Sequence, residues 1–394
     1  MYNVLFLTTV LPHQQRMGSE VASQCFIDAL EAIGCTVTVV GYMRKDDPFE
    51  PQPQELVVGT RYIETKKSKL NTILWLTRSF LLGLPYSAAK YHSRAYQECL
   101  RECLSTTPFD LVIVDHPQLA WLHRVAQRAI PKLPHGLVAI AHNIEHEIYQ
   151  SNADSAQNRL TQWIYQREAH QIKALENDLA VQADQVWALT EHDAAYFDKR
   201  SPAAHAIAFD LPPGMATEQS IETPPKTFDI ALIGSWAWKP NEDGLRWFLQ
   251  EVYPLLPAHL TIQVAGRGAD WLAGQYPNID YVGFVPSAQG FMAQARVVAI
   301  PTLSGGGIQI KTLDAIASGS NIVATPVAIR GISNPPSTLS VAETAKGFAN
   351  QLSLSIESAT DETTAVEAAN WLTTRQANFT SEISQSLEKL FGKS

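Results

Sequence analysis

The start of the chain alternates an apolar run, a helical pattern and a second apolar run, and this order constrains the fold more than any other feature. Val4–Leu7 is strand-length, a helical pattern follows through Phe26 and Leu30, and Gly34 precedes the next run, Thr36–Val40. Parallel strands need a crossover helix of this kind, so we predict an α/β protein with doubly wound parallel sheets. The first loop then lies at the carboxyl end of a strand, where α/β proteins bind ligands.

The length of 394 residues suits two domains. A second series of strands and helices opens at Phe228–Gly234, after a polar, proline-rich stretch near 205–225. We therefore predict two Rossmann-like domains facing across a cleft, one over residues 1–205 and one over 206–375. Residues 376–394 are predicted to form a helix that packs back on the first domain.

The composition excludes several classes of protein. With 45% hydrophobic and 18% charged residues the chain is typical of a globular protein, and its net charge of −9 argues against nucleic-acid binding. No apolar run approaches the roughly 20 residues that cross a bilayer. The start carries no signal-peptide pattern and the four cysteines form no paired motif, so we expect a cytoplasmic protein with reduced thiols.

One segment departs from the acidic balance. Residues 61–101 contain eight Lys or Arg and two Glu, a net charge of +6, with leucines and aromatic residues between the charges. Such a segment can lie on an anionic membrane surface, which would place the protein peripherally at the inner face of the plasma membrane. Alternatively, a crossover helix buries this apolar face on the sheet.

A glycine turn follows the apolar run Val297–Pro301 and opens a helix. Three successive glycines, Gly305–Gly307, permit close approach of the backbone, so the N–H groups of the helix start can face a phosphate. Lys311 and Asp314 project from one face of that helix and suit the phosphates and ribose of a nucleotide diphosphate. The alternative is a glycine turn into a packed helix, with Ile308 in the core.

Polar side chains follow two other predicted strands. His116 comes after Phe109–Asp115, and His142 and Glu145 come after Leu137–Ala141. His142 is predicted to donate to a ligand hydroxyl or a developing charge, and Glu145 to orient it or to accept from the substrate. A structural histidine at a strand end is the alternative.

A metal site is conceivable from His142, His146 and Glu147. These residues crowd one turn without further partners in the sequence, so we predict no bound metal. The later loop Gly266-Arg267-Gly268 lacks the third glycine of the dinucleotide fingerprint, which argues against a nicotinamide dehydrogenase. Asn241 is predicted to cap the helix after the strand Phe228–Gly234.

Together these motifs resemble a glycosyltransferase of the GT-B fold, and specifically the bacterial family-4-type retaining enzymes of surface polysaccharide synthesis. The resemblance covers nearly the whole chain. It rests on Gly18-Ser19, His142–Glu145, Ala183–Asp193, Pro213-Gly214, Gly234 with Trp238–Asn241, Val264–Gly266, Val282–Val285 and Gly305–Gly319.

The resemblance implies a nucleoside-diphosphate sugar bound mainly by the second domain, a glycan or lipid-linked acceptor bound mainly by the first, and no metal or other cofactor. His142 and Lys311 would act in catalysis, and Glu145 and His116 on the acceptor side. The donor would be held by Gly18, Lys239, Arg267, Gly305, Gly306, Gly307, Ile308, Gln309, Lys311 and Asp314.

The sequence departs from the family pattern at one position. The family often has two glutamates eight residues apart, where this chain has Gly306 and Asp314. Two alternatives remain beside a glycosyltransferase. One is a sugar-nucleotide 2-epimerase, which shares the two-domain architecture, and the other is an inactive glycan-binding or scaffold subunit, which the missing first carboxylate favours.

Overall fold

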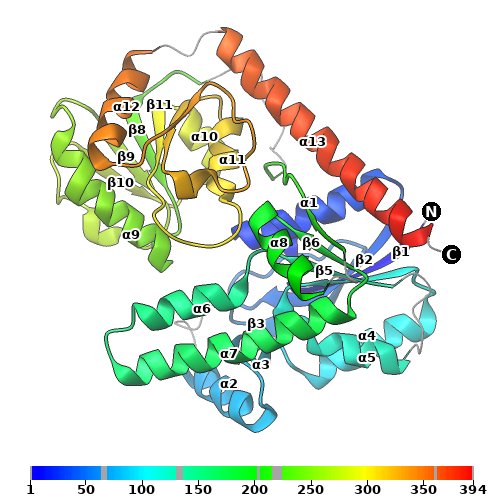
Figure 1. The fold of residues 1–394 in the computed structure, drawn as a ribbon. Coiled ribbons are helices and arrows are strands. Elements are labelled where there is room, and N and C mark those ends of the chain that lie inside the picture. The colour runs from blue at the N-terminus through cyan, green and yellow to red at the C-terminus, as the bar shows by residue number, and fades with distance from the viewer. Residues whose placement is uncertain are drawn as a thin grey trace. The chain divides into compact units, whose positions relative to one another are not determined.

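The chain folds into two compact units, each an α/β layer structure (Figure 1). The computed structural model describes residues 2–63, 69–129, 136–201, 205–214, 224–358 and 362–392. Unit 1 comprises residues 1–209 and 379–394, and unit 2 comprises residues 210–378. Lys66, Lys67 and residues 215–223 of the predicted linker lie outside the described residues.

Unit 1 contains a seven-stranded parallel sheet in the order β3-β2-β1-β4-β5-β6-β7. The predicted α/β class is confirmed. In this sheet, the edge strands β3 and β7 are half-exposed and lack a continuous apolar run, so the sequence did not predict them. The strands are β1 (Asn3–Val10), β2 (Thr36–Arg44), β3 (Glu55–Arg61), β4 (Leu111–Asp115), β5 (Leu137–Ala141), β6 (Gln185–Ala188) and β7 (His205–Ala208).

Helices cover both faces of this sheet, because alternate side chains of a strand point to opposite faces. On one face of the sheet, Val186 of β6 joins a core with helices α4, α5, α7 and α8. On the other face, Trp187 of β6 packs against Phe26 of α1, and Phe26 also contacts Phe379 of the last helix. The helices are α1 (Gly18–Ala32), α2 (Lys69–Leu82), α3 (Tyr86–Ala89), α4 (Arg94–Thr106), α5 (Trp121–Ala129), α6 (Glu145–Asp154), α7 (Arg159–Gln182) and α8 (Glu191–Arg200).

The segment 61–101 does not form a crossover helix that buries its apolar face on the sheet, so that alternative of the sequence analysis is wrong. The chain instead breaks into α2, α3 and α4. On α2 the large apolar side chains Ile73, Leu74, Phe80, Leu81 and Leu82 are exposed. Gly83, with φ of 65°, ends α2.

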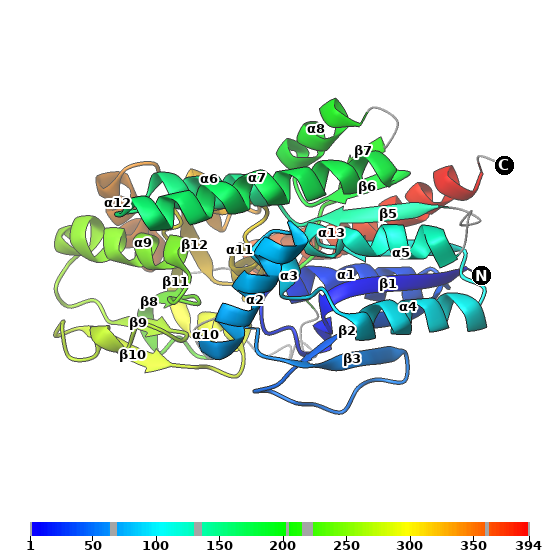
Figure 2. The ribbon, with the colours of Figure 1, turned by 90° about the horizontal axis from the view of Figure 1, so that it is seen from below.

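Unit 2 contains a six-stranded parallel sheet in the order β10-β9-β8-β11-β12-β13. Strands β8 to β12 are labelled in Figure 2. Val297 and Ala299 of β11 face the core of α9 and α12, and the alternate residues Val298 and Ile300 face α10 and α11, which contact β11. The strands are β8 (Phe228–Ile233), β9 (Ile262–Ala265), β10 (Ile279–Gly283), β11 (Ala295–Ile300), β12 (Asn321–Ala324) and β13 (Leu339–Val341); the helices are α9 (Lys239–Trp247), α10 (Ala288–Ala293), α11 (Ile310–Ala317) and α12 (Ala345–Glu357).

The last helix, α13 (Glu362–Phe391), is continuous, and its end from Phe379 belongs to unit 1. There Ser386 accepts a hydrogen bond from the indole N–H of Trp187 at 3.1 Å. In unit 2, Arg375 Nε donates to the carbonyl oxygen of Leu211 at 2.7 Å. None of the helices in the described part of the chain combines the length and hydrophobicity that crossing a bilayer requires.

Candidate functional site

The carboxyl end of the unit 1 sheet brings several polar side chains together. Asp115 is the last residue of β4 and pairs in register with Ile140 of β5, so His142, directly after β5, lies beside it. Thr8 lies in the neighbouring strand β1, and Ser23 lies in α1. Parallel strands end at the same edge, and this clustering follows from that geometry.

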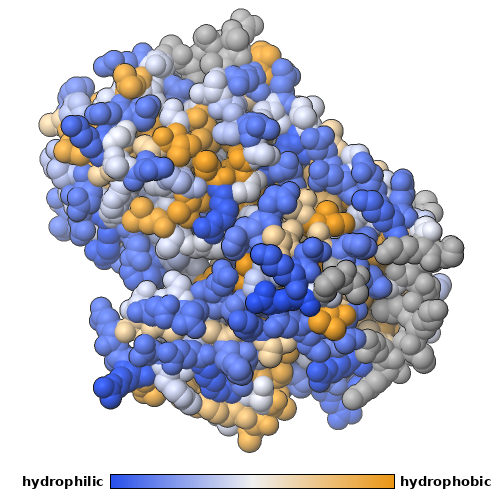
Figure 3. Space-filling model, in the orientation of Figure 1, coloured by the Kyte–Doolittle hydropathy of each residue, from blue (hydrophilic) through white to orange (hydrophobic). Residues whose placement is uncertain are grey.

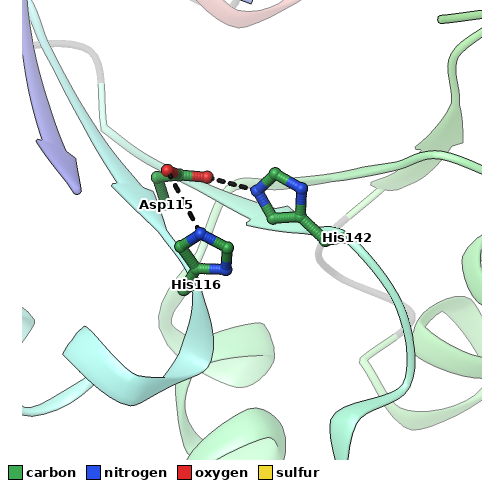
Figure 4. Close-up of side chains that lie close together, drawn as sticks. All are labelled: Asp115, His116 and His142. Carbon is green, nitrogen blue, oxygen red and sulfur yellow. Dashed lines mark hydrogen bonds and ion pairs between the residues drawn. The ribbon is translucent and has the colours of Figure 1, made fainter. Parts of the chain in front are cut away.

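Asp115 is fully buried and lies at the centre of this network (Figure 4). Its Oδ2 accepts hydrogen bonds from the hydroxyls of Thr8 and Ser23, both at 2.7 Å, and its Oδ1 lies 2.6 Å from Nε2 of His142. Burial by itself raises the pKa of Asp115, but His116, His142 and the hydroxyl of Ser23 outweigh burial and hold the pKa well below its usual range. The group is therefore a carboxylate at neutral pH.

Because Asp115 is an acceptor, the proton of neutral His142 is fixed on Nε2 and a lone pair is left on Nδ1. That Nδ1 is buried and has no hydrogen-bond partner among the described residues. An unpaired buried acceptor costs free energy unless a ligand satisfies it. His142 Nδ1 is thus suited to accept a hydrogen bond, or a proton, from a ligand.

His116 stacks on His142, with ring centroids 4.1 Å apart and planes inclined by 19°. Its backbone adopts φ of 84°, a left-handed conformation that is uncommon for a residue with a Cβ. Burial lowers the pKa of His116 to about 4, although Asp115 opposes the shift. His116 is therefore neutral at physiological pH and packs against His142 without charge repulsion.

Glu145 begins α6 in the same region. Its backbone N–H donates to Oε1 of Glu176 at 2.6 Å, and Oε2 of Glu176 lies 2.8 Å from Nδ1 of His146. Burial, followed by the negative charge of Glu176, raises the pKa of Glu145 to about 7. Glu145 can therefore exchange a proton near neutral pH.

The residues His142, His146 and Glu147 do not come together as metal ligands, since His146 pairs with Glu176 and Glu147 is exposed. In the described ranges, the group with metal-ligand spacing is instead Asp115, His116 and His142, whose ligand atoms lie within 4.8 Å of one another. Both oxygens of Asp115 already accept hydrogen bonds, which accounts for this cluster as a hydrogen-bonded network.

In unit 2 the glycine turn lies after β11, as predicted. Gly305 and Gly307 have φ of 126° and 62°, conformations that side chains rarely allow, and Gln309 is the N-cap residue of α11. The guanidinium of Arg330 donates to the carbonyl oxygen of Gly305. The turn is therefore held in place at the start of α11, where backbone N–H groups can bind an anion.

Lys311 lies in the first turn of α11, and its Nζ donates to Oδ1 of Asn241 at 2.9 Å. Burial lowers the pKa of Lys311 to about 8. The prediction that Asn241 caps α9 is wrong: the N-cap residue is Trp238 without a side-chain bond, and Asn241 lies inside the first turn. There Asn241 Nδ2 donates to the carbonyl oxygen of Ser235 at 3.1 Å, which ties the loop after β8 to Lys311.

Asp314 lies one turn after Lys311 and accepts a hydrogen bond from Nε2 of Gln289 at 3.1 Å. Burial raises the pKa of Asp314 to about 6. Ile308 is buried, as the packed-helix alternative expects, but Lys311 and Asp314 are only partly buried. The helix therefore serves the core with one face and presents two titratable groups with another.

The other predicted donor-binding residues occupy less enclosed positions. Arg267 lies between two glycines in the loop after β9, with its guanidinium 4.8 Å from the ring of the exposed Phe284. Lys239 is exposed at the start of α9 and pairs with Asp243. Gly18 is the first residue of α1, in unit 1.

Sequence reasoning did not assign a site role to Asp115, Asn241 or Gln289. The available signal for Asp115 was its place at the end of an apolar strand, directly before His116. Asparagine near a helix start is usually an N-cap residue, so the sequence around Asn241 predicted a cap and not a contact with Lys311. Gln289 carried no signal, because its contact with Asp314 joins separate helices.

Comparison with known proteins supports the fold and the second unit. Residues 227–357 match the family described as glycosyl transferases group 1. No curated protein matches the chain. Among solved structures, sucrose-phosphate synthase from Thermosynechococcus elongatus is similar with a TM-score of 0.67, 16% identity and 100% of both chains covered.

Two further structures show the same architecture. Anabaena HepE, in complex with UDP and glucose, has a TM-score of 0.58 and 14% identity, with 100% of both chains covered. The lipopolysaccharide outer core galactosyltransferase WaaB has a TM-score of 0.56 and 12% identity, with 98% of this chain and 100% of that chain covered. The chain therefore has the GT-B fold, and the match of residues 227–357 to glycosyl transferases group 1 supports an enzyme of the hexosyltransferase type.

Proposed function

We propose that the protein transfers a sugar from a nucleoside-diphosphate sugar to a glycan or lipid-linked acceptor, with retention at the anomeric carbon and without a bound metal. The domain match over residues 227–357 supports the transferase class. HepE, a structural neighbour, is in complex with UDP and glucose, which supports a nucleotide-sugar donor. The resemblance to bacterial family-4-type enzymes supports retention and the acceptor class.

The observation that carries the proposal is the position of Lys311 in the first turn of α11, beside the glycine turn. A departing diphosphate would meet the ammonium of Lys311 and the free N–H groups at the helix start. Both stabilise negative charge that develops in the transition state, and this electrostatic stabilisation would take the place of a metal ion. Asp314 would accept hydrogen bonds from the ribose hydroxyls of the donor.

In unit 1, Nδ1 of His142 would accept a hydrogen bond from a substrate hydroxyl, and Asp115, which is bonded to Nε2, would hold the proton of the neutral ring on that opposite nitrogen. Glu145 and His116 would lie on the acceptor side. We assign these groups binding and electrostatic roles, because the proposed retaining chemistry does not use the carboxylate pair of hydrolases.

The experiment that tests the proposal is a thermal-shift and calorimetric screen of the full chain against UDP, GDP, ADP, dTDP and their sugars, with and without EDTA. We expect one nucleotide to raise Tm selectively, EDTA to leave the shift unchanged, and Lys311→Ala to abolish it. Release of the nucleotide only with an acceptor present marks a transferase. An epimerised nucleotide sugar formed without acceptor, or no shift with any nucleotide, would overturn the proposal.

A further inference from the structure

Helix α2 turns its apolar side outward. Leu81 is 79% exposed and Ile73 is 63% exposed, whereas Ser79 is fully buried. A helix that served only to cover the sheet would have the opposite arrangement, with leucine inside and serine outside. Trp75 is a large apolar side chain that α2 does bury. The exposed apolar side of α2 therefore needs an explanation other than the core of unit 1.

The neighbouring helix α7 extends this apolar side. Phe80 of α2 stacks on Trp163 of α7, with ring centroids 6.2 Å apart and planes inclined by 13°. Hydrophobic residues gather over α2 at the lower edge of the space-filling view (Figure 3). We call this region the α2–α7 surface, which consists of Ile73, Leu74, Phe80, Leu81, Leu82, Leu160, Trp163 and Ile164.

The α2–α7 surface is held in place by polar contacts beneath it. Arg167 of α7 donates to the hydroxyl of Ser79 at 2.9 Å, and its guanidinium lies 4.2 Å from the ring centroid of Phe80. Glu168 accepts from the backbone N–H groups of Tyr86 and Ser87 at 2.6 and 2.8 Å, which fixes α3 against α7. The exposed side chains therefore stand on a preorganised helix pair.

The charge around this surface is basic, although the chain as a whole carries −9. No Asp or Glu occurs between Glu64 and Glu98, or between Asp154 and Glu168. Of the arginines on these two helices, Arg159 of α7 is exposed. Arg78 and Arg167 donate to the carbonyl oxygens of His92 and Ser79, and their charges lie beneath the apolar side chains. Exposed apolar residues on stretches that carry cations and no carboxylates match an interface that is apolar inside and anionic at its edge.

We propose that the α2–α7 surface docks on an anionic lipid bilayer. Leu81, Leu82 and their neighbours would enter the acyl boundary, while Trp163 would lie at the headgroup level and Arg159 would bind lipid phosphates. A second copy of the chain fits less well, because a two-fold contact through this surface sets the same cations against one another.

The α2–α7 surface is connected to the carboxyl end of the unit 1 sheet, where His116 lies. Helices α3 and α7 both contact the 3₁₀ turn Pro117–Leu119, which directly follows His116. A bilayer on the α2–α7 surface would therefore lie on the part of unit 1 next to the proposed acceptor residues. This consequence, a membrane-borne acceptor, rests on the proposed function, whereas docking itself does not.

The test is co-sedimentation of the full chain with vesicles of phosphatidylcholine, alone or mixed with phosphatidylglycerol. Wild type is expected to bind the anionic vesicles, to bind neutral ones weakly, and to dissociate as salt rises. Leu81→Asp should weaken binding about tenfold or more, because a charge replaces an inserted apolar side chain. Leu354→Asp on α12 is the matched control, since Leu354 is 57% exposed in unit 2, and should bind as wild type does.

Wild-type binding by Leu81→Asp would overturn the proposal, and so would equal binding to neutral and anionic vesicles. A concentration-dependent dimer that Leu81→Asp dissociates, without vesicle binding, would assign the surface to a second copy. Nucleotide binding by the same preparations keeps the two proposals apart. Vesicle binding without nucleotide binding contradicts the transferase alone, and the reverse contradicts docking alone.

Discussion

Asp115 Oδ1 accepts a hydrogen bond from Nε2 of His142 at 2.6 Å, and the opposite ring nitrogen of His142 is buried without a partner among the described residues. The carboxylate thus determines which nitrogen of the imidazole carries the proton. Thr8 and Ser23 hold the second oxygen of Asp115, so the carboxylate cannot rotate without losing both hydroxyl bonds. The acceptor at His142 Nδ1 is therefore set by residues from three separate elements, β1, α1 and β4.

Replacing Asp115 by asparagine should reverse this tautomer. The hydroxyls of Thr8 and Ser23 would donate to the amide oxygen of Asn at position 115, so the amide N–H₂ group would face His142. That N–H₂ group would donate to Nε2 of His142, and the proton of the neutral imidazole would then lie on Nδ1. We expect Asp115→Asn to lower kcat about tenfold or more and to change the pH profile. Steady-state kinetics against pH measures both effects.

Asp110→Asn is the matched control for that variant. Asp110 also lies beside β4, but its carboxylate binds the backbone N–H of Asn3 at 2.7 Å, away from His142. The Asp110→Asn variant loses one negative charge, as Asp115→Asn does, and its kcat should equal that of the wild type. Wild-type kinetics in Asp115→Asn, with a folded protein by circular dichroism, would contradict a positioning role.

The affinity for nucleoside diphosphate should fall at alkaline pH. The pKa of Lys311 is about 8, below its usual 10.5, so the ammonium of the empty site is lost as pH rises through that value. Above it, affinity should weaken about tenfold per pH unit, because binding must first return a proton to the amine. Calorimetry across this range measures the decline.

Lys311→Arg separates charge from titration, because a guanidinium stays protonated throughout this range. Its affinity should not show the alkaline decline, whatever its absolute value. Lys239→Ala, which removes an exposed lysine paired with Asp243, should retain the decline. An alkaline decline that persists in Lys311→Arg would assign the titration to another group.

Asp314→Asn should stabilise the protein and weaken nucleotide binding. The pKa of Asp314 is about 6 in the folded protein against its usual 3.8, so the folded state binds a proton more readily than the unfolded state. The free energy of unfolding therefore falls as pH rises from about 4 to 6, and asparagine removes this loss. We expect a gain of about 1 kcal/mol at pH 7, reduced by the partial exposure of the side chain.

Denaturant unfolding of Asp314→Asn at pH 7 and at about pH 4 measures that gain, which should vanish at the lower pH. Nucleotide affinity should fall in the same variant, because an amide replaces an acceptor for ribose hydroxyls. If Asp314→Asn and the wild type are equally stable at both pH values, burial does not disfavour the charged form of the Asp314 carboxyl.

The sequence predicted the strands and the loops that carry the site better than it predicted the contacts within them. Buried parallel strands are continuous apolar runs, so the pattern of apolar residues alone places His142 and Gly305 after strand ends. The edge strands β3, β7 and β13 were not predicted, because short or half-exposed strands lack that signal. The hydrogen-bond partners of the site residues were not predicted either, for a different reason.

Those partners come from distant parts of the sequence. Asp115 receives hydroxyls from Thr8 and Ser23, and Asn241 meets Lys311 seventy residues later in the chain. Local preference pointed the other way for Asn241, since asparagine near a helix start favours a cap. Tertiary contacts of this kind depend on loop geometry, which periodicity does not encode.

A substitution in the glycine turn distinguishes the effect of backbone conformation from the effect of steric space. Gly305 has φ of 126°, and a Cβ there would meet Gln309 Nε2 at an ordinary 3.7 Å, so alanine fits the space but not the backbone. Gly274 has φ of 71° with open space around it, in the same unit but in the connection between β9 and β10. Each alanine variant should lose about 1–2 kcal/mol of stability, because both replace a residue at positive φ. Only Gly305→Ala should also weaken nucleotide binding, since its strain is relieved by moving the backbone that meets the diphosphate. Equal nucleotide affinity in the two variants, measured by calorimetry, would remove the turn from the donor site.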